Sequence, residues 1–156
     1  MKNNVLCLLT GLLVAASLHA QTLTEEKLKI ICDEVDTAFW YGMKAGENLD
    51  ADMLSENVDD NLNAGHIING VFFGSFEPIL QRVTSNMQDL YSLQYEIDEK
   101  RITVLSEDAA ILAVSGKTKA ESTSGQEFST PFAWTFIYRK TGDQWKVIHS
   151  HQSNPR

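Results

Sequence analysis

The sequence is poor in cysteine, proline and positive charge. It has two cysteines, three prolines, and 13 basic residues against 21 acidic ones, which gives a net charge of −8. Cys7 lies in the apolar N-terminal segment, so Cys32 alone belongs to the rest of the chain and cannot form an internal disulfide. We expect a domain stabilised by its hydrophobic core. No basic cluster is visible, which argues against nucleic acids and anionic membranes as partners.

The sequence also lacks an apolar run long enough to cross a membrane. The longest run, residues 5–18, follows Lys2 and is followed by Ala20. It is too short for a membrane span and is typical of a secretory signal, although Leu18 replaces the small residue expected there. We expect residues 1–20 to be a signal peptide and residues 21–156 to form one exported domain, periplasmic or secreted.

Helical signals fill the first half of this domain. Thr22 and Glu25 fit a capping box for a long helix that ends near Gly46, and its apolar residues recur at helical spacing. A short helix is expected over residues 50–56, and a strand and loop over 57–74. Ser75 is suited to cap a further helix that ends near residue 90.

Strand and turn signals fill the second half. Residues 92–105 alternate between apolar and polar, but the phase changes near residues 98–101, which predicts a bulge or bend. Strands are also expected over residues 109–121, 127–140 and 145–153, with turns between them. Helices followed by long antiparallel strands predict an α+β fold, with a bent sheet that carries helices on one face.

Two runs in this half resemble a known family. The run AWTFIYRKTGDQWKVIHSHQS, residues 133–153, resembles the C-terminal hairpin of the association domain of calcium/calmodulin-dependent protein kinase II. ITVLSEDAAILAVSG, residues 102–116, resembles the preceding strand pair, and SFEP, residues 75–78, has a loose counterpart. The chain is also similar to SnoaL-like proteins of the same nuclear transport factor 2-like superfamily, from residue 24 to residue 153.

The resemblance implies a cone, in which a strongly curved antiparallel sheet wraps a long N-terminal helix and two further helices complete the fold. Members of the superfamily include isomerases, cyclases and dehydratases, small-molecule binders and pure assembly domains, so the fold does not decide the function. The kinase domain has arginines in its pocket, at positions that align with Gly116, Thr135 and Gln152 here. Their replacement suggests an uncharged or weakly polar ligand.

The last two strands each present two possible faces to such a pocket. Matching to the kinase domain places the smaller side chains inside, among them the candidate ligand-binding residues Thr135, Ile148, Ser150 and Gln152. The larger side chains would then face outward and form a homodimer interface. These are Trp134, Phe136, Tyr138, Trp145, His149 and His151. In the alternative interpretation the aromatic residues point inward and fill the core.

His149 and His151 would share one face of a strand, as metal ligands often do. A zinc site needs three or four ligands, and no motif beside the pair supplies the others, so we expect no metal and no cofactor. The alternative is a structural role, in which both histidines form hydrogen bonds in the sheet or at a subunit contact.

Acid–base catalysis in this superfamily would need a base that faces a hydrogen-bond donor. His66 is the best candidate for the base, with Tyr41 as a second candidate catalytic residue and Tyr95 as a further one. A surface-loop histidine is the alternative for His66. Asp59 and Asp60 fit turn chemistry better than a catalytic dyad.

Three aromatic residues are expected either to line the entrance of the pocket or to pack in the core. These are Trp40, Phe72 and Phe73. The residue spacing supports no Ser-His-Asp arrangement. We therefore expect a domain that binds a small apolar or weakly polar molecule, with cofactor-free isomerase- or cyclase-type chemistry. The alternative is a non-enzymatic module for ligand binding or oligomerisation.

Overall fold

The computed structural model describes residues 23–154. The expected signal peptide, residues 1–20, and the expected cap Thr22 lie outside this range. In the described range no helix is long and apolar enough to cross a membrane.

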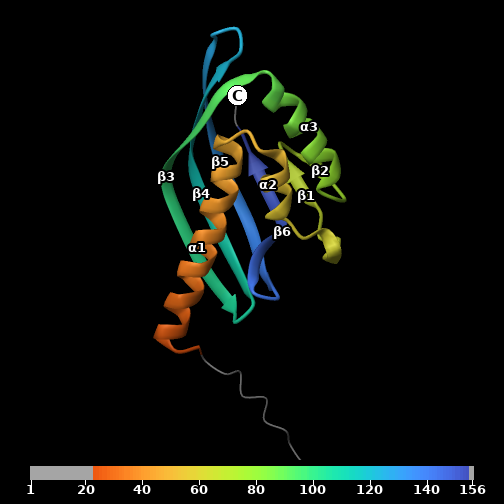
Figure 1. Cartoon of the computed structure of the whole chain (residues 1–156). Coiled ribbons are helices and arrows are strands. Elements are labelled where there is room, and N and C mark those ends of the chain that lie inside the picture. Colours follow the sequence, from red (N-terminus) through yellow and green to blue (C-terminus); the bar gives the residue numbers. More distant parts are fainter. Residues whose placement is uncertain (1–22, 155–156) are drawn as a thin grey trace, which may run out of the picture.

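Between residues 23 and 88 the structure has three helices, a short 3-10 turn and two short strands (Figure 1). The helices are α1 (Glu25–Glu47), α2 (Ala51–Glu56) and α3 (Glu77–Gln88), and the 3-10 turn η1 covers Asp60–Leu62. Thr24, rather than Thr22, caps α1, because its side chain accepts a hydrogen bond from the Lys27 N–H.

In the part of the chain that the structure describes, six strands form one mixed sheet that is not closed. The strands are β1 (His66–Ile68), β2 (Val71–Phe73), β3 (Leu90–Ser106), β4 (Ala109–Ser122), β5 (Glu127–Thr141) and β6 (Gln144–Ser153). Their order is β2-β1-β6-β5-β4-β3, and the pairing of β1 with β6 is parallel whereas the others are antiparallel. The α+β fold is as predicted, and so is the phase change in β3, where the register shifts between Ile97 and Glu99.

The core lies between α1 and the inner face of this sheet. Ile31, Val35, Phe39 and Met43 recur every four residues along α1, and all four are buried. They pack with inward-facing residues of β4 and β5, such as Leu112. In Figure 1 α1 runs along the sheet, while α2 and α3 lie beside its far end, next to β1 and β2.

The aromatic residues of β5 belong to this core, so their predicted outward orientation is wrong. Phe132, Phe136 and Tyr138 are buried, and Trp134 packs against the same cluster. Trp145 of β6 is buried too. The alternative interpretation, with aromatics pointing inward, therefore holds for this strand, because burying four large rings removes much apolar surface from water.

A β-bulge explains why the orientation of β6 was predicted only in part. Ile137 pairs with His149, but the next residue, Tyr138, pairs with Val147, so Ile148 is an extra residue on β6. Trp145 and Val147 face inward before the bulge, and Ser150 and Gln152 face inward after it. The single alternation assumed from the sequence thus fails at Ile148, which does not line the inner cavity.

Candidate functional site

An apolar cavity of about 290 Å³ lies between the inner face of the sheet and the helices. Its walls come from helices α1, α2 and α3, the segment after α2, strand β1 and strands β3 to β6. Aromatic rings of β5 form one wall, with Trp134 and Phe136 among them. No Lys, Arg, Asp or Glu of the described range lines it. Its polar groups include His66, Ser150, Gln152, Tyr95 and Asn57.

His66 is the ionisable residue at the centre of the site. It opens β1 beside β6, where the parallel register places it next to Ser150. Its side chain is 1% exposed, and Phe76 packs against the ring at a centroid distance of 5.5 Å. The expected surface-loop alternative for His66 is therefore wrong, because β1 carries the residue into the sheet.

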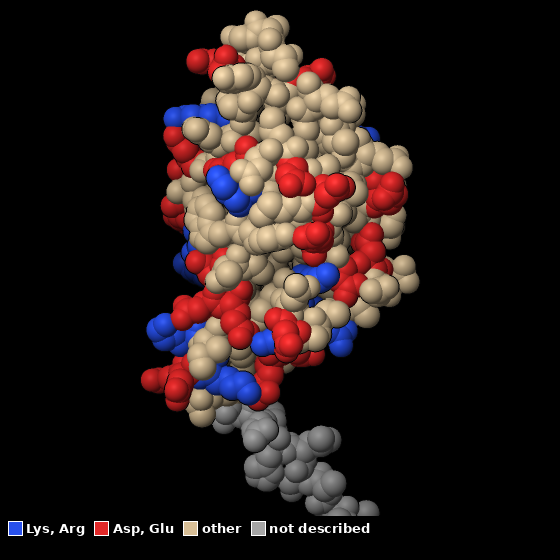
Figure 2. Space-filling model, in the orientation of Figure 1, with Lys and Arg blue, Asp and Glu red and all other residues tan. Residues whose placement is uncertain are grey.

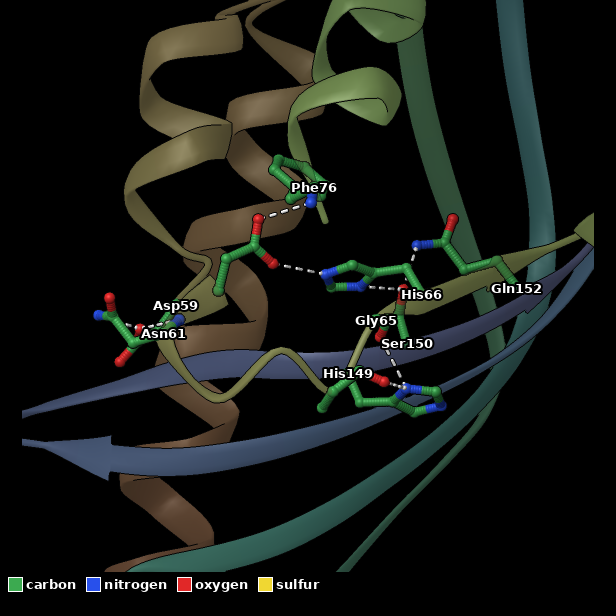
Figure 3. A network of polar contacts seen from close by, with 10 residues as sticks. Asp59, Asn61, Gly65, His66, Phe76, His149, Ser150 and Gln152 are labelled. Carbon is green, nitrogen blue, oxygen red and sulfur yellow. Dashed lines mark hydrogen bonds and ion pairs between the residues drawn. The ribbon is translucent and has the colours of Figure 1, made fainter. Parts of the chain in front are cut away.

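Both ring nitrogens of His66 are engaged by other side chains. Nδ1 lies 3.0 Å from Ser150 Oγ, and Nε2 lies 3.1 Å from Asp60 Oδ1. Gln152 Nε2 donates to Ser150 Oγ at 3.3 Å. Figure 3 shows this chain of contacts from Gln152 through Ser150 and His66 to the carboxylate below Phe76. We call Asp60, His66 and Ser150 the relay.

The start of α3 fixes the far end of the relay. The Phe76 N–H donates to Asp60 Oδ2 at 2.5 Å, so the carboxylate occupies the place where a side-chain cap was expected from Ser75. Helix N-termini favour a negative charge because their first N–H groups have no partner in the helix. Asp59 shows the predicted turn chemistry, because its side chain accepts a hydrogen bond from the Asn61 N–H, whereas Asp60 has contacts beyond the turn.

The relay is a Ser-His-Asp arrangement that the residue spacing did not indicate. Asp60 and His66 are close in sequence, but Ser150 follows 84 residues later. Sequence spacing carries no signal for such a pair, because the parallel β1–β6 pairing alone brings them together.

Tyr95 lines the same cavity from β3. Burial raises the pKa of Tyr95 to about 12, and the Glu47 carboxylate adds to the effect, so the phenol is a neutral donor at pH 7. Gly46 of α1 makes room for it, since a Cβ at that position would lie 2.4 Å from the hydroxyl oxygen.

Several other predicted site residues lie away from this cavity. Trp40 is 43% exposed and lies under the Lys100 ammonium group, 4.8 Å from its ring centre. Tyr41 is 40% exposed and donates a 2.6 Å hydrogen bond to Glu56, so it does not reach the relay. Thr135 is on the outer face, opposite His151.

The positions of Phe72 and Phe73 also differ from the prediction that they line the pocket mouth. Phe72 is exposed, and Phe73 is covered by the Arg82 guanidinium group at 5.4 Å instead of lining the cavity.

His149 points outward and binds the Gly65 carbonyl oxygen at 2.8 Å through Nδ1, which anchors the segment before β1. Within residues 23–154 no group of three or more potential metal ligands is close enough together to hold an ion.

A family model identifies the chain independently. The model of the calcium/calmodulin-dependent protein kinase II association domain matches residues 62–155, which is more than half of the sequence. The chain belongs to this association domain family. A comparison with curated proteins found no match.

Solved structures agree on the nuclear transport factor 2-like fold. A presumed dehydratase of that family from Streptomyces avermitilis has a TM-score of 0.70 and 17% identity, covering 83% of this chain and 99% of that chain. A presumed association domain from Xanthomonas campestris gives 0.68 and 17%, with coverage of 78% and 86%. A hexachlorocyclohexane dehydrochlorinase gives 0.70 and 11%, with coverage of 85% and 90%. At these identities the likeness establishes the fold of this association domain, not its activity.

Proposed function

We propose that this association domain binds a small apolar or weakly polar molecule in its inner cavity and performs cofactor-free acid–base chemistry on it. The observation that carries the proposal is the relay of Asp60, His66 and Ser150 at the wall of an apolar cavity. A buried histidine held by a carboxylate has a fixed ring orientation, as a general base requires, and the Ser150 hydroxyl at Nδ1 would pass the proton between the ligand and the ring.

The surroundings of the relay suit proton transfer in an uncharged ligand. Among residues 23–154 no Lys or Arg lines the cavity to attract a phosphate or a carboxylate, so charged substrates gain nothing by entering. Tyr95 supplies a neutral hydroxyl that could donate to a developing enolate. Elimination and isomerisation both begin with such a proton transfer, and the names of two solved relatives, a dehydratase and a dehydrochlorinase, fit that class.

Deuterium exchange tests the proposal without knowledge of the natural substrate. The purified protein would be incubated in heavy water with a panel of compact cyclic ketones, and NMR would follow exchange at the carbon next to the carbonyl group. We expect protein-catalysed exchange that falls by about 10²–10⁴ in a His66→Gln variant, the usual contribution of a general base. A Thr135→Val variant, altered on the outer face, serves as the control.

The non-enzymatic alternative also has an observation in its favour. Both nitrogens of His66 are satisfied within the protein, and the Asp60 carboxylate ties α3 to the sheet through Phe76. In that case the relay stabilises the wall of a binding pocket. Co-purified ligand in native mass spectra, with no exchange on any ketone and equal rates in wild type and His66→Gln, would favour this binding role.

A further inference from the structure

The relay leaves one group to meet a bound ligand. Asp60 occupies Nε2 of His66 and Ser150 occupies Nδ1, so the ring has no free nitrogen to present to the cavity. Ser150 lines the cavity and is 2% exposed to the outside of the protein. A molecule in the cavity therefore reaches the base only through the Ser150 hydroxyl.

The direction of each hydrogen bond follows from the groups involved. An ionised carboxylate only accepts, so His66 Nε2 donates to Asp60, and Nδ1 of the neutral ring is then an acceptor. Ser150 Oγ donates its proton to Nδ1 and accepts a hydrogen bond from the Gln152 amide. This arrangement pulls the hydroxyl proton towards the base and leaves one lone pair of Oγ free.

We propose that Ser150 is a nucleophile that takes the acyl group from a small uncharged ester. The inference rests on the proposed function in so far as it uses the same cavity and the same base. It goes further because the chemistry becomes covalent. The order of groups matches that of a serine hydrolase relay, although Asp60 and Ser150 bind the opposite ring nitrogens from those in the chymotrypsin arrangement.

The reaction consists of two balanced steps. Ser150 Oγ bonds to the ester carbonyl carbon while its proton moves to His66 Nδ1, and the ester C–O bond then breaks as the leaving alkoxide takes that proton. In the second step a water molecule gives a proton to His66 and its oxygen attacks the acyl-serine. The bond from the acyl carbon to Oγ breaks, and Oγ recovers the proton, which releases a carboxylic acid.

The cavity limits the ester by size and charge. A volume of about 290 Å³ excludes nucleotide-sized acyl carriers, and the uncharged lining of the described residues disfavours phosphate or carboxylate groups. The Gln152 amide and the Tyr95 hydroxyl line the same cavity as Ser150, and they are the candidate donors to the carbonyl oxygen during attack.

A short-chain 4-nitrophenyl ester tests the inference on the full chain. We expect a burst of about one equivalent of 4-nitrophenolate per chain, with an acyl adduct located on Ser150 by mass spectrometry of peptides. Ser150→Ala and His66→Gln should each lower the burst rate at least a hundredfold. Ser153→Ala, changed at an exposed serine of the same strand, should leave it unaltered.

The controls separate folding defects from chemistry. Circular dichroism melts establish that each variant folds, and Ser150→Cys retains a nucleophile, so it should still form the adduct at position 150 if the side chain acts covalently. An unacylated Ser150 in folded wild-type protein, an adduct on another residue, or an undiminished burst in Ser150→Ala would each overturn the inference.

The same wild-type preparation distinguishes this inference from the proposed function. Deuterium exchange without an adduct on Ser150 would overturn the covalent role and leave acid–base catalysis in place. An adduct without exchange on any ketone would support the covalent role and contradict the proposed proton abstraction. Absence of both would overturn the two together.

Discussion

At the scale of single residues, two carboxylates hold different elements of the fold together. Asp60 bonds to His66 and to the start of α3, and Glu34 of α1 accepts hydrogen bonds from two residues more than a hundred positions away. These are Lys140 Nζ, at 2.8 Å, and Trp145 Nε1, at 2.7 Å. Charge-assisted hydrogen bonds of this kind are stronger than neutral ones, so each carboxylate fixes the position of its partners.

Glu34 gives the association domain a predictable response to acid. The hydrogen bonds from Lys140 and Trp145 lower the pKa of Glu34 below its ordinary value of 4.5. A carboxyl group with a lowered pKa in the folded state stabilises the fold above its ordinary pKa, and this contribution is lost as the pH falls through the folded value.

We therefore expect the stability difference between wild type and Glu34→Gln to be largest near pH 7 and to shrink below pH 4.5. Urea unfolding followed by tryptophan fluorescence measures both free energies across this range. A difference that is independent of pH would contradict the assigned role of the ionised carboxylate.

At the scale of elements, the register shift between Ile97 and Glu99 in β3 and the extra residue in β6 decide which side chains point inward. The shift in β3 turns Tyr95 and Ile102 to the same side, and the extra residue in β6 turns Ser150 inward next to Phe136. Strands with an uninterrupted alternation could not do both, because the side-chain period is two. The site thus depends on irregularities in the sheet rather than on the sheet alone.

Gly116 allows β4 to approach the shifted part of β3. A Cβ at this position would lie 2.1 Å from the Glu96 carbonyl oxygen and 3.0 Å from the Phe132 ring. Backbone of a central strand cannot move aside cheaply, so we expect Gly116→Ala to lower the free energy of unfolding by about 1–3 kcal/mol.

Gly74→Ala is the matched control for Gly116→Ala. A Cβ at Gly74 would have no neighbour within 4 Å, so its effect should stay within about 0.5 kcal/mol. Chemical denaturation of both variants measures the two values, and equal stabilities would contradict the close approach.

At the scale of the whole molecule, the outer sheet face replaces the aromatic face as the candidate dimer interface. Ile111 pairs with Ile137 and Ala113 with Thr135, so the middle of this face carries small and aliphatic side chains. The predicted interface residue His151 lies on it too, opposite Thr135. Figure 2, which views another side, shows basic groups separated by acidic ones and no continuous basic surface among the described residues there.

We propose that two copies of the association domain pair through this outer face. An Ile137→Arg variant would place a charge in the middle of the interface, and size-exclusion chromatography with light scattering should then report a monomer. Ile30→Arg, on the exposed side of α1, should remain dimeric. A monomeric wild type would contradict the proposal.

The sequence by itself determined the α+β class, the positions of most helices and strands and the bend in β3. It also identified His66 as the candidate catalytic base. These features follow from local signals, namely periodicity, turn residues and a family resemblance that covers nearly the whole domain. The bulge at Ile148 has no such signal, since every residue around it is compatible with a regular strand.

Only the tertiary structure decided which faces point inward and which residues meet. Asp60, His66 and Ser150 come together because β1 pairs in parallel with the last strand, and that pairing depends on the packing of the whole chain. The aromatic residues of β5 lie inside because α1 offers them an apolar surface to cover. Contacts between distant segments are set by such packing, and local sequence does not encode them.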